Sequence, residues 1–390
     1  MPLKRLLIAC AVVFAGASTG FAQTAADPIL SPYGGRAPNY YIMDVGSGQV
    51  LAQLNADIPL PPASMSKMMT LAMLFDALAE GRISMDTTWA VSERAHAMGG
   101  SRQFLETRDR PTTEDLIRGV SVVSGNDSSV VVAEGLGGSE EGFAQLAQTR
   151  AQQLGMTQTT LANSSGWPDP RHRMSLHDLG ILGRYLIEEH SEYYHYLAEP
   201  EFTWNGITQP NRLPLLGAGI GVDGLKTGHT QEAGYAMLGS AVQGSRRIIF
   251  VFSGLDSVAE RSQEAERMIT WAFRQFVERR VVQSGQAVAE AEVWMGTADR
   301  VPLVAAQDLS VLMPAIPQGD IVSRVEYAGP LAAPVEQGAE VARLIVEVPG
   351  LSEPFTMPLV AGAAVPEGGF VPRMWTAAQV LGTQLGLVTP

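Results

Sequence analysis

The periodicity of the apolar residues changes once along the 390-residue chain, near Arg280. Before this point, stretches with an apolar residue every three or four positions are interspersed with short alternating stretches, as expected for helices and strands. After it, residues 281–367 lack a 3.6-residue period and alternate instead, as in 342–348, with Pro and Gly between the stretches. The pattern predicts a mixed α/β domain of the α+β kind, with helices and short antiparallel strands, followed by a small all-β domain.

Individual elements of the first domain can be assigned from the same periodicity. A hairpin is predicted over 39–55 and a helix over 64–79, where apolar residues recur at helical spacing. Further helices are predicted at 113–122, 127–137, 141–154, 175–190 and 260–277, and strands at 235–242 and 247–254.

The N-terminus has the features of a secretory signal. A charged start at Lys4 and Arg5 precedes an apolar stretch over 6–17 and a small-residue cleavage site ending at Ala22. A membrane anchor is the alternative, but the apolar stretch is shorter than the roughly 20 residues that a span needs. The only cysteine, Cys10, lies inside this segment, so the mature chain would have no disulfide. Export without cysteines favours a bacterial envelope protein over a disulfide-stapled secreted domain. The expected location is the periplasm.

The charge balance excludes one class of partner. The chain has 27 basic and 40 acidic side chains, a formal charge of −13, whereas a nucleic-acid-binding protein needs a dense positive face. Only three of the basic residues are lysines, Lys4, Lys67 and Lys226, so 27 − 3 = 24 are arginines.

Three short motifs carry residues that could catalyse a reaction: Ser64-Met65-Ser66-Lys67, Ser124-Gly125-Asn126 and Lys226-Thr227-Gly228. The first alone is weak evidence, because Ser64 could simply cap a helix. All three in this order, each at a predicted helix start, loop or strand, form a much stronger signal.

The first motif has the spacing of a serine nucleophile and its base. A serine hydroxyl is a weak nucleophile until a neighbouring base takes its proton. Residues three apart lie on one face of a helix, so Lys67 can reach the oxygen of Ser64 at the helix start. A lysine base must be neutral for part of the cycle, and burial and a second cation, Lys226, would both lower its pKa.

The other two motifs supply polar groups for a substrate. Ser124 can relay a proton, and the amide of Asn126 offers both a donor and an acceptor to a substrate amide. The third motif is predicted to lie on an edge strand, where Lys226 and Thr227 can bind a substrate carboxylate. Gly228 lets a substrate backbone approach that strand closely.

The three motifs, together with His229 and Thr230, resemble the signature motifs of the low-molecular-mass penicillin-binding proteins, the serine-type D-alanyl-D-alanine carboxypeptidases. The resemblance extends over nearly all of the mature chain through the segments 62–67, 100–102, 114–116, 162–166, 222–224, 233–235, 271–273, 293–296 and 366–368. It implies a β-lactamase/DD-peptidase-like catalytic domain followed by a β-rich stalk domain.

The resemblance also implies a reaction. Ser64 would attack the carbonyl between two D-alanines of a peptidoglycan stem peptide with Lys67 as base, and the backbone N–H groups of Ser64 and His229 would form the oxyanion hole. Water would then hydrolyse the acyl-enzyme, and β-lactams would acylate the same serine. No cofactor is implied, and His172 and His177 lack the spacing of a zinc motif, so no metal site is expected.

Two departures from the family pattern matter. Some members bind the substrate carboxylate with an arginine soon after the strand that follows the third motif, but residues 253–257 contain none, which leaves Arg261 as the nearest candidate. Membrane-anchored members often end in a basic amphipathic helix. The corresponding segment, 370–388, carries only Arg373, which leaves peripheral attachment to the inner membrane open.

Alternative functions on the same site are a DD-endopeptidase, a weak β-lactamase, or a non-catalytic peptidoglycan-binding protein. A class A β-lactamase needs a deacylating glutamate after the second motif, and residues 142–187 contain none. The predicted organisation is a signal peptide (1–22), a catalytic domain (23–278), a β-sandwich-like domain (279–367) and a C-terminal tail with a possible amphipathic helix (368–390).

Overall fold

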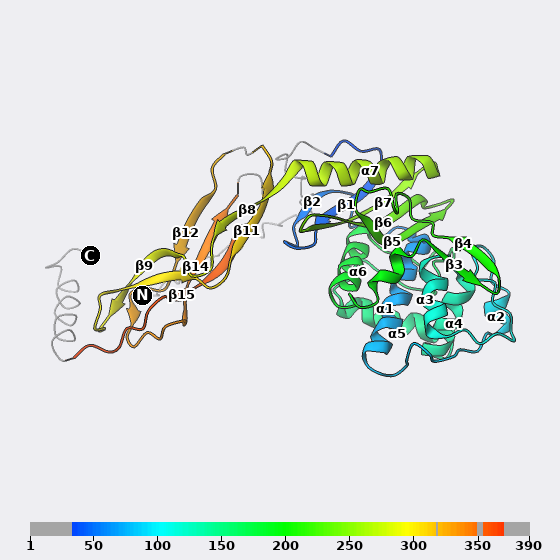
Figure 1. Cartoon of the computed structure of the whole chain (residues 1–390), viewed down its shortest axis with the longest axis horizontal. Helices are drawn as coiled ribbons and strands as arrows, with labels where there is room; N and C mark the ends of the chain where they lie inside the picture. The colour runs from blue at the N-terminus through cyan, green and yellow to red at the C-terminus, as the bar shows by residue number, and fades with distance from the viewer. Residues whose placement is uncertain (1–32, 317–318, 349–353, 370–390) are drawn as a thin grey trace, which may run out of the picture.

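The computed structural model describes residues 33–316, 319–348 and 354–369. The predicted signal peptide, with Cys10, lies outside these residues, as does the predicted helix over 370–388. The described chain forms an elongated molecule, with a mixed α/β domain at one end and an all-β domain at the other (Figure 1). This is the fold class predicted from the change in periodicity, and that prediction is confirmed.

A five-stranded antiparallel sheet forms the centre of the first domain. Its strands are, in order across the sheet, β2 (Val50–Leu54), β1 (Asn39–Asp44), β7 (Arg246–Leu255), β6 (Gly234–Gln243) and β5 (Val222–Thr230). Strand β1 of the N-terminal hairpin thus pairs with β7, more than 200 residues later in the chain. The edge strand β5 carries the third motif, as the sequence predicted.

Helices cover both faces of this sheet. The helices are α1 (Lys67–Ala79), α2 (Glu93–His96), α3 (Thr113–Ser121), α4 (Asn126–Gly137), α5 (Glu140–Gln153), α6 (Leu176–Glu188) and α7 (Val258–Gln275). Two 3-10 turns, η1 (Ala63–Ser66) and η2 (Tyr194–Ala198), and a hairpin of β3 (Glu201–Trp204) and β4 (Ile207–Pro210) complete the domain. Helix α2 and the β3–β4 hairpin escaped the sequence analysis because four residues are too few to show a period.

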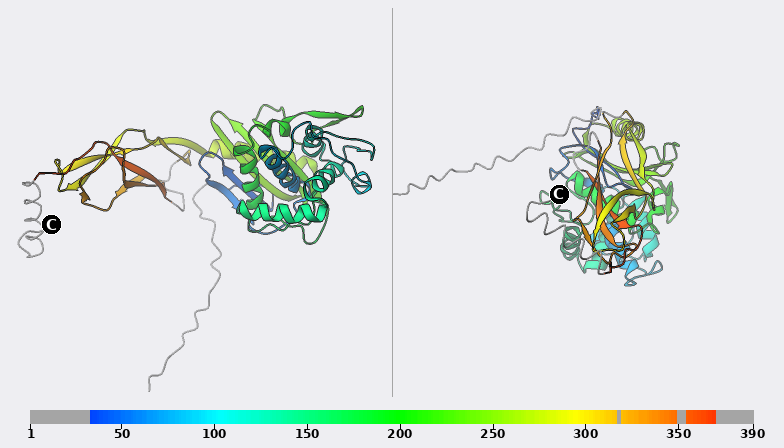
Figure 2. Two further views of the ribbon diagram at one scale, coloured as in Figure 1. Left: turned by 90° about the horizontal axis from the view of Figure 1, so that it is seen from below. Right: turned by 90° about the vertical axis from the view of Figure 1, so that its left-hand side faces the viewer.

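The sheet separates two hydrophobic cores. Helix α7 lies along one face, and α1, α3, α4, α5 and α6 are gathered beyond the other (Figures 1 and 2). Met68, Leu71 and Phe75 of α1 are fully buried in the larger core, whereas Met268 and Ile269 of α7 close the smaller one. Helix α1, which begins at Lys67 of the first motif, is therefore among the most buried helices in the described part of the chain.

The predicted helix over 64–79 differs from the structure at its start. Ser64 belongs to the 3-10 turn η1, and the α-helix begins only at Lys67. Ala63, which opens the turn, has a left-handed φ of 50°, so the chain bends sharply before the helix starts. Ser64 therefore lies on a tight turn, not in the first turn of an α-helix.

The second domain is built from two layers of strands around one core. One layer has the order β12 (Val322–Glu326), β14 (Glu340–Glu347), β15 (Phe355–Ala361), β10 (Arg300–Ala305), β9 (Ala287–Trp294) and β13 (Leu331–Ala332), and the other pairs β8 (Phe276–Val282) with β11 (Leu309–Pro314). Strand β8 continues directly from α7 and spans the predicted domain boundary at residue 278. No helix among the described residues is long and apolar enough to cross a membrane.

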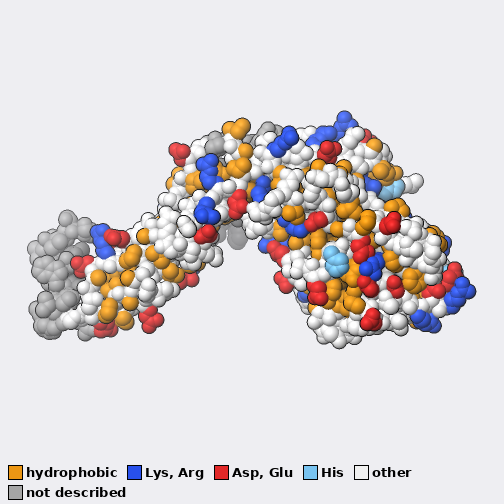
Figure 3. Space-filling model, in the orientation of Figure 1, with side chains coloured by type: hydrophobic (Ala, Val, Ile, Leu, Met, Phe, Trp, Pro, Cys, Tyr) orange, Lys and Arg blue, Asp and Glu red, His pale blue; other side chains and the backbone are white. Residues whose placement is uncertain are grey.

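Acidic and basic side chains are interspersed over the face of the molecule shown in Figure 3. This face has no continuous positive patch of the kind that a nucleic-acid backbone requires.

Candidate active site

The first motif brings a serine and a lysine into direct contact. The Nζ atom of Lys67 lies 3.0 Å from Oγ of Ser64, one turn along the chain. The lysine is fully buried, whereas Ser64 is only partly buried and lines an open cleft. The sequence spacing correctly predicted this contact, although a 3-10 turn makes it in place of a helical turn.

Two further oxygen atoms bind the same ammonium group. The Nζ atom of Lys67 donates to Oδ1 of Asn126 at 2.7 Å and to the backbone carbonyl of Ser165 at 2.6 Å. Asn126 opens α4, and its Nδ2 atom donates to the carbonyl of Gly99 at 2.8 Å. The amide of Asn126 is therefore largely occupied by the protein itself, whereas the sequence analysis assigned both of its ends to substrate.

The surroundings of Lys67 favour its neutral form. Burial, followed by the positive charge of Arg212, lowers its pKa to about 7, against a weaker opposing effect of Asp127. The carboxylate of Asp127 accepts hydrogen bonds from the backbone N–H groups of Gln103 and Leu105 and does not contact the lysine. A lysine with a pKa near 7 is half neutral at physiological pH, as a general base requires.

The third motif lies on β5 beside this pair. Lys226 is buried, and its burial together with the charges of Lys67, Arg212 and Arg261 lowers its pKa well below the ordinary value. Thr227 is also buried, whereas His229 is exposed near the end of the strand, where its ring contacts that of Tyr235 with centroids 4.1 Å apart.

Gly228 has a packing reason to be glycine that the sequence analysis did not identify. A Cβ atom at this position would face η1, 3.0 Å from the carbonyl oxygen of Pro62 and 3.2 Å from Cβ of Ala63. The glycine thus lets β5 pack against the turn that carries Ser64. Gly166 serves the same turn from the other side, because its φ is +76° and a Cβ there would overlap the carbonyl of Ala63.

Ser124, in the second motif, lies buried in the loop between α3 and α4. Its φ of 63° is left-handed, which is uncommon for a residue other than glycine and is often found at functional sites. Within the described residues its hydroxyl makes no hydrogen bond, so the hydroxyl is free to turn toward a bound molecule.

Two arginines complete the surroundings of the lysines. Arg212, in the loop after β4, donates to the hydroxyl of Ser101 and was missed by the sequence analysis because it lies outside every motif. Arg261, the candidate from α7, is buried with its guanidinium 5.6 Å from the ring centroid of Tyr235. Its Nε atom is buried and has no hydrogen-bond partner in the described chain. Neither arginine, nor Lys226, forms an ion pair with any described carboxylate.

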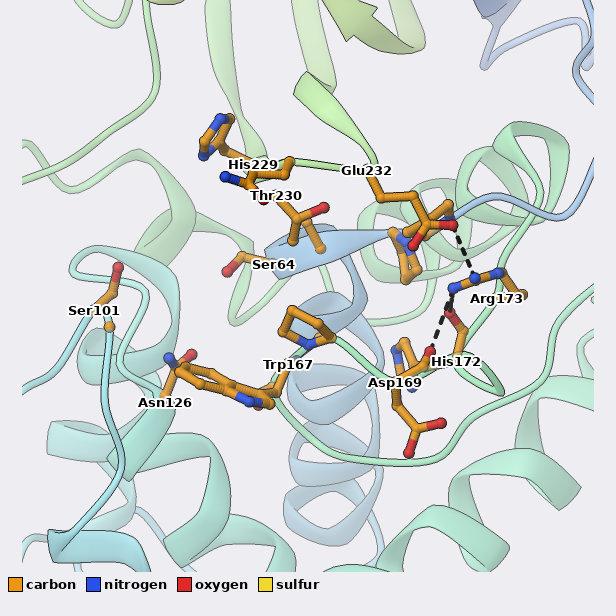
Figure 4. Close-up of a pocket in the computed structure, with 18 residues that line it drawn as sticks. Ser64, Ser101, Asn126, Trp167, Asp169, His172, Arg173, His229, Thr230 and Glu232 are labelled. Atoms are coloured by element: carbon orange, nitrogen blue, oxygen red, sulfur yellow. Dashed lines mark hydrogen bonds and ion pairs between the residues drawn. The ribbon is translucent and has the colours of Figure 1, made fainter.

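The cleft around Ser64 has a volume of about 530 Å³. Ser64 points into it between His229 and Thr230 on one side and Trp167 and Asn126 on the other (Figure 4). At one end, Arg173 bridges the two walls through an ion pair with Glu232, with 2.9 Å between nitrogen and oxygen. Among the described residues no group of three or more His, Cys, Asp and Glu side chains is arranged to hold a metal ion.

Comparison with known proteins identifies the family. Residues 23–257 match the family model described as D-alanyl-D-alanine carboxypeptidase, and residues 276–367 match the C-terminal domain of penicillin-binding protein 5. The chain is 35% identical over 383 residues to the D-alanyl-D-alanine carboxypeptidase DacC of Escherichia coli strain K12, covering 96% of this chain and 94% of that protein.

Two solved structures are each similar to a large part of the chain. The crystal structure of penicillin-binding protein 5 from Haemophilus influenzae superposes with a TM-score of 0.75 at 33% identity, covering 85% of this chain and 98% of that one. Penicillin-binding protein D2 from Listeria monocytogenes, in an ampicillin-bound form, has a TM-score of 0.56 at 28% identity and covers 63% of this chain and 99% of that one. The chain therefore belongs to the D-alanyl-D-alanine carboxypeptidase family and is a serine peptidase of that type.

Proposed function

We propose that the chain removes the terminal D-alanine from peptidoglycan stem peptides through an acyl-enzyme on Ser64, with Lys67 as the base. The observation that carries this proposal is the 3.0 Å contact between Nζ of Lys67 and Oγ of Ser64 at a lysine whose pKa is lowered to about 7. A buried lysine of ordinary pKa could not accept the serine proton, and an exposed one would not have its pKa lowered.

The partners of Lys67 also orient its lone pair. A neutral amine has two hydrogens and one lone pair. The carbonyl oxygen of Ser165 and Oδ1 of Asn126 can act only as hydrogen-bond acceptors. Together they therefore accept from both N–H groups of the neutral lysine. Ser64 is the remaining neighbour, and the lone pair is therefore directed at its hydroxyl.

The reaction follows from this arrangement. Ser64 passes its proton to Lys67 as its oxygen bonds to the carbonyl carbon between the two D-alanines. Backbone N–H groups of Ser64 and His229, both lining the cleft, stabilise the oxyanion. The C–N bond breaks, the leaving amine takes a proton relayed by Ser124, and water then hydrolyses the ester to restore Ser64.

Uncompensated positive charge supports binding of the terminal carboxylate beside β5. Arg212 and Arg261 both lower the pKa of Lys226, and Arg212 also lowers that of Arg261. None of the three forms an ion pair with a described carboxylate. Two guanidinium charges beside a lysine, with no paired carboxylate, favour a negatively charged ligand, whose charge would in turn favour the ammonium form of Lys226. We assign this role to Lys226 and Thr227 on the strand, assisted by the two arginines.

The proposal has a direct test. The purified protein should shorten a stem pentapeptide by one alanine in mass spectrometry, and a fluorescent penicillin should label it covalently, as expected from the acyl-enzyme chemistry. Ser64→Ala should abolish both reactions. Ser66→Ala is the matched control, because Ser66 is buried in the same turn without a hydrogen-bond partner and should keep both. Labelling that survives in Ser64→Ala would refute the assignment of the nucleophile.

The remaining predictions concern location. We infer export to the periplasm through residues 1–22 and peripheral association with the inner membrane through 368–390. The N-terminal sequence of protein recovered from the envelope should begin at Gln23. Removal of 368–390 should release the protein from membranes if that segment attaches it.

A further inference from the structure

The buried side chain of Glu140 binds the loop that contains Ser165, whose carbonyl accepts a hydrogen bond from Lys67. Glu140, the first residue of α5, is 5% exposed. Its Oε1 atom accepts hydrogen bonds from the backbone N–H of Ser164 at 3.2 Å and from the hydroxyl of Ser164 at 2.9 Å. Its Oε2 atom accepts from Nη2 of Arg94 at 2.6 Å. One carboxylate therefore holds the loop to two helices, α2 and α5.

Ser164, which Glu140 binds, also contacts helix α1, on which Lys67 lies. The carbonyl of Ser164 accepts from the hydroxyl of Thr70 at 2.6 Å, and the next carbonyl, that of Ser165, accepts from Nζ of Lys67 at 2.6 Å. Both Thr70 and Lys67 belong to α1. Ser164 is thus held between α1 and Glu140, and this anchoring fixes the direction of the Ser165 carbonyl.

The direction of that carbonyl matters for the chemistry of Lys67. If it turns away, one N–H of the neutral lysine loses its acceptor and can donate to Ser64 instead. A lysine that donates to the hydroxyl does not present its lone pair to the serine proton. A shift of about 1 Å in such a contact can lower the rate of a chemical step by about a hundredfold.

We propose that Glu140 is a positioning residue for the general base, acting through Ser164 and Ser165 on the orientation of Lys67. The inference rests on the proposed function of Lys67. Glu140 does not line the cleft around Ser64, so it acts without touching substrate. Because its carboxylate is occupied by Ser164 and Arg94, it is also not placed as the deacylating glutamate of a β-lactamase.

The test separates the chemical step from binding. The acylation rate constant and the dissociation constant of the non-covalent complex are measured from the concentration dependence of penicillin labelling. Glu140→Ala should lower the rate constant by about ten- to a hundredfold and leave the dissociation constant within twofold. Glu140→Gln keeps the shape of the side chain and should give a smaller loss, since its amide can serve only one of the two partners. Glu141→Gln is the matched control, because Glu141 pairs with the same Arg94 but is exposed, and it should acylate normally.

A second variant tests the path through the loop. Ser164→Ala should slow acylation less than Glu140→Ala. The double variant should acylate no more slowly than Glu140→Ala alone, because both changes remove the same contact between Glu140 and Ser164. The proposal is overturned if folded Glu140→Ala or Glu140→Gln acylates at the wild-type rate constant. It is also overturned if the two single losses multiply, or if the dissociation constant rises as much as the rate constant falls. Absence of labelling in the wild-type protein would instead refute the proposed function.

Discussion

The acylation rate of Ser64 should follow the titration of Lys67. Burial and the charge of Arg212 lower the pKa of this lysine to about 7, and only its neutral form can accept the serine proton. With that pKa, the neutral fraction is about 9% at pH 6, about 50% at pH 7 and about 91% at pH 8. The rate constant should therefore rise about tenfold from pH 6 to pH 8 and then level off.

The alternative gives a clearly different curve. A lysine with the ordinary pKa of about 10.4 would give a rise of about a hundredfold over the same two pH units, and the rise would continue past pH 9. The assay is the acylation rate constant for a fluorescent penicillin, measured at saturation between pH 5.5 and pH 9.5. A steady tenfold increase per pH unit up to pH 9 would contradict the lowered pKa of Lys67. A flat profile throughout would contradict its assignment as the base.

A single variant tests the stated cause of the low pKa. Arg212→Gln removes a cation that lowers the pKa of Lys67, so the midpoint of the profile, measured at saturating penicillin, should move to higher pH. The matched control is Arg184→Gln on α6, where the arginine pairs with Glu188 at the surface, and its midpoint should not move. A midpoint that is unchanged in Arg212→Gln, or that moves to lower pH, means that this charge does not tune the lysine.

Three further outcomes can be measured on purified variants. Lys67→Arg should abolish acylation although it keeps the charge, since a guanidinium does not deprotonate; labelling at near the wild-type rate would contradict this. Because the pKa of Lys67 falls from 10.5 to about 7 on folding, folding releases its proton between these pH values. The free energy of unfolding of the wild type, minus that of Lys67→Met, should therefore rise with pH over that range in denaturant titrations. Gly166→Ala should lower the thermal midpoint far more than Gly155→Ala, because both have a left-handed φ but only the first would meet backbone atoms; equal losses would contradict the packing argument.

The residues that the sequence revealed are those whose roles depend on local spacing. Ser64 and Lys67 are three residues apart, so any helical turn brings them together. In the same way, the change in apolar periodicity near Arg280 predicts a domain of helices and strands followed by a domain of strands alone. The contacts that shape the base come from far along the chain. Ser165 is 98 residues from Lys67 and contributes only a backbone carbonyl, which every residue type possesses. The family resemblance covers 162–166, but the spacing of residue types does not show that the carbonyl of Ser165 binds Lys67.

Arg212 and Glu140 were missed for a related reason. Each belongs to a residue type that is common on surfaces, and each acquires a role only when the fold buries it or brings it near a lysine. Glu140 also lies at the start of α5, where an acidic residue has an ordinary explanation in the helix dipole. The sequence also does not show that η1 lies beside Gly228, which is a packing reason for glycine in addition to the predicted approach of substrate.

The distribution of lysine and arginine has a physical basis at this site. The chain has 24 arginines and three lysines, and the two lysines in the described residues, Lys67 and Lys226, are both buried in the site. A lysine can lose its proton when burial and neighbouring charge make the ammonium unfavourable, whereas a guanidinium remains charged in the same surroundings. Arg212 therefore acts as a fixed charge that lowers the pKa of both lysines, and Arg261 as one that lowers the pKa of Lys226. A lysine in place of Arg212 could release its own proton, which would weaken the effect that makes Lys67 a base.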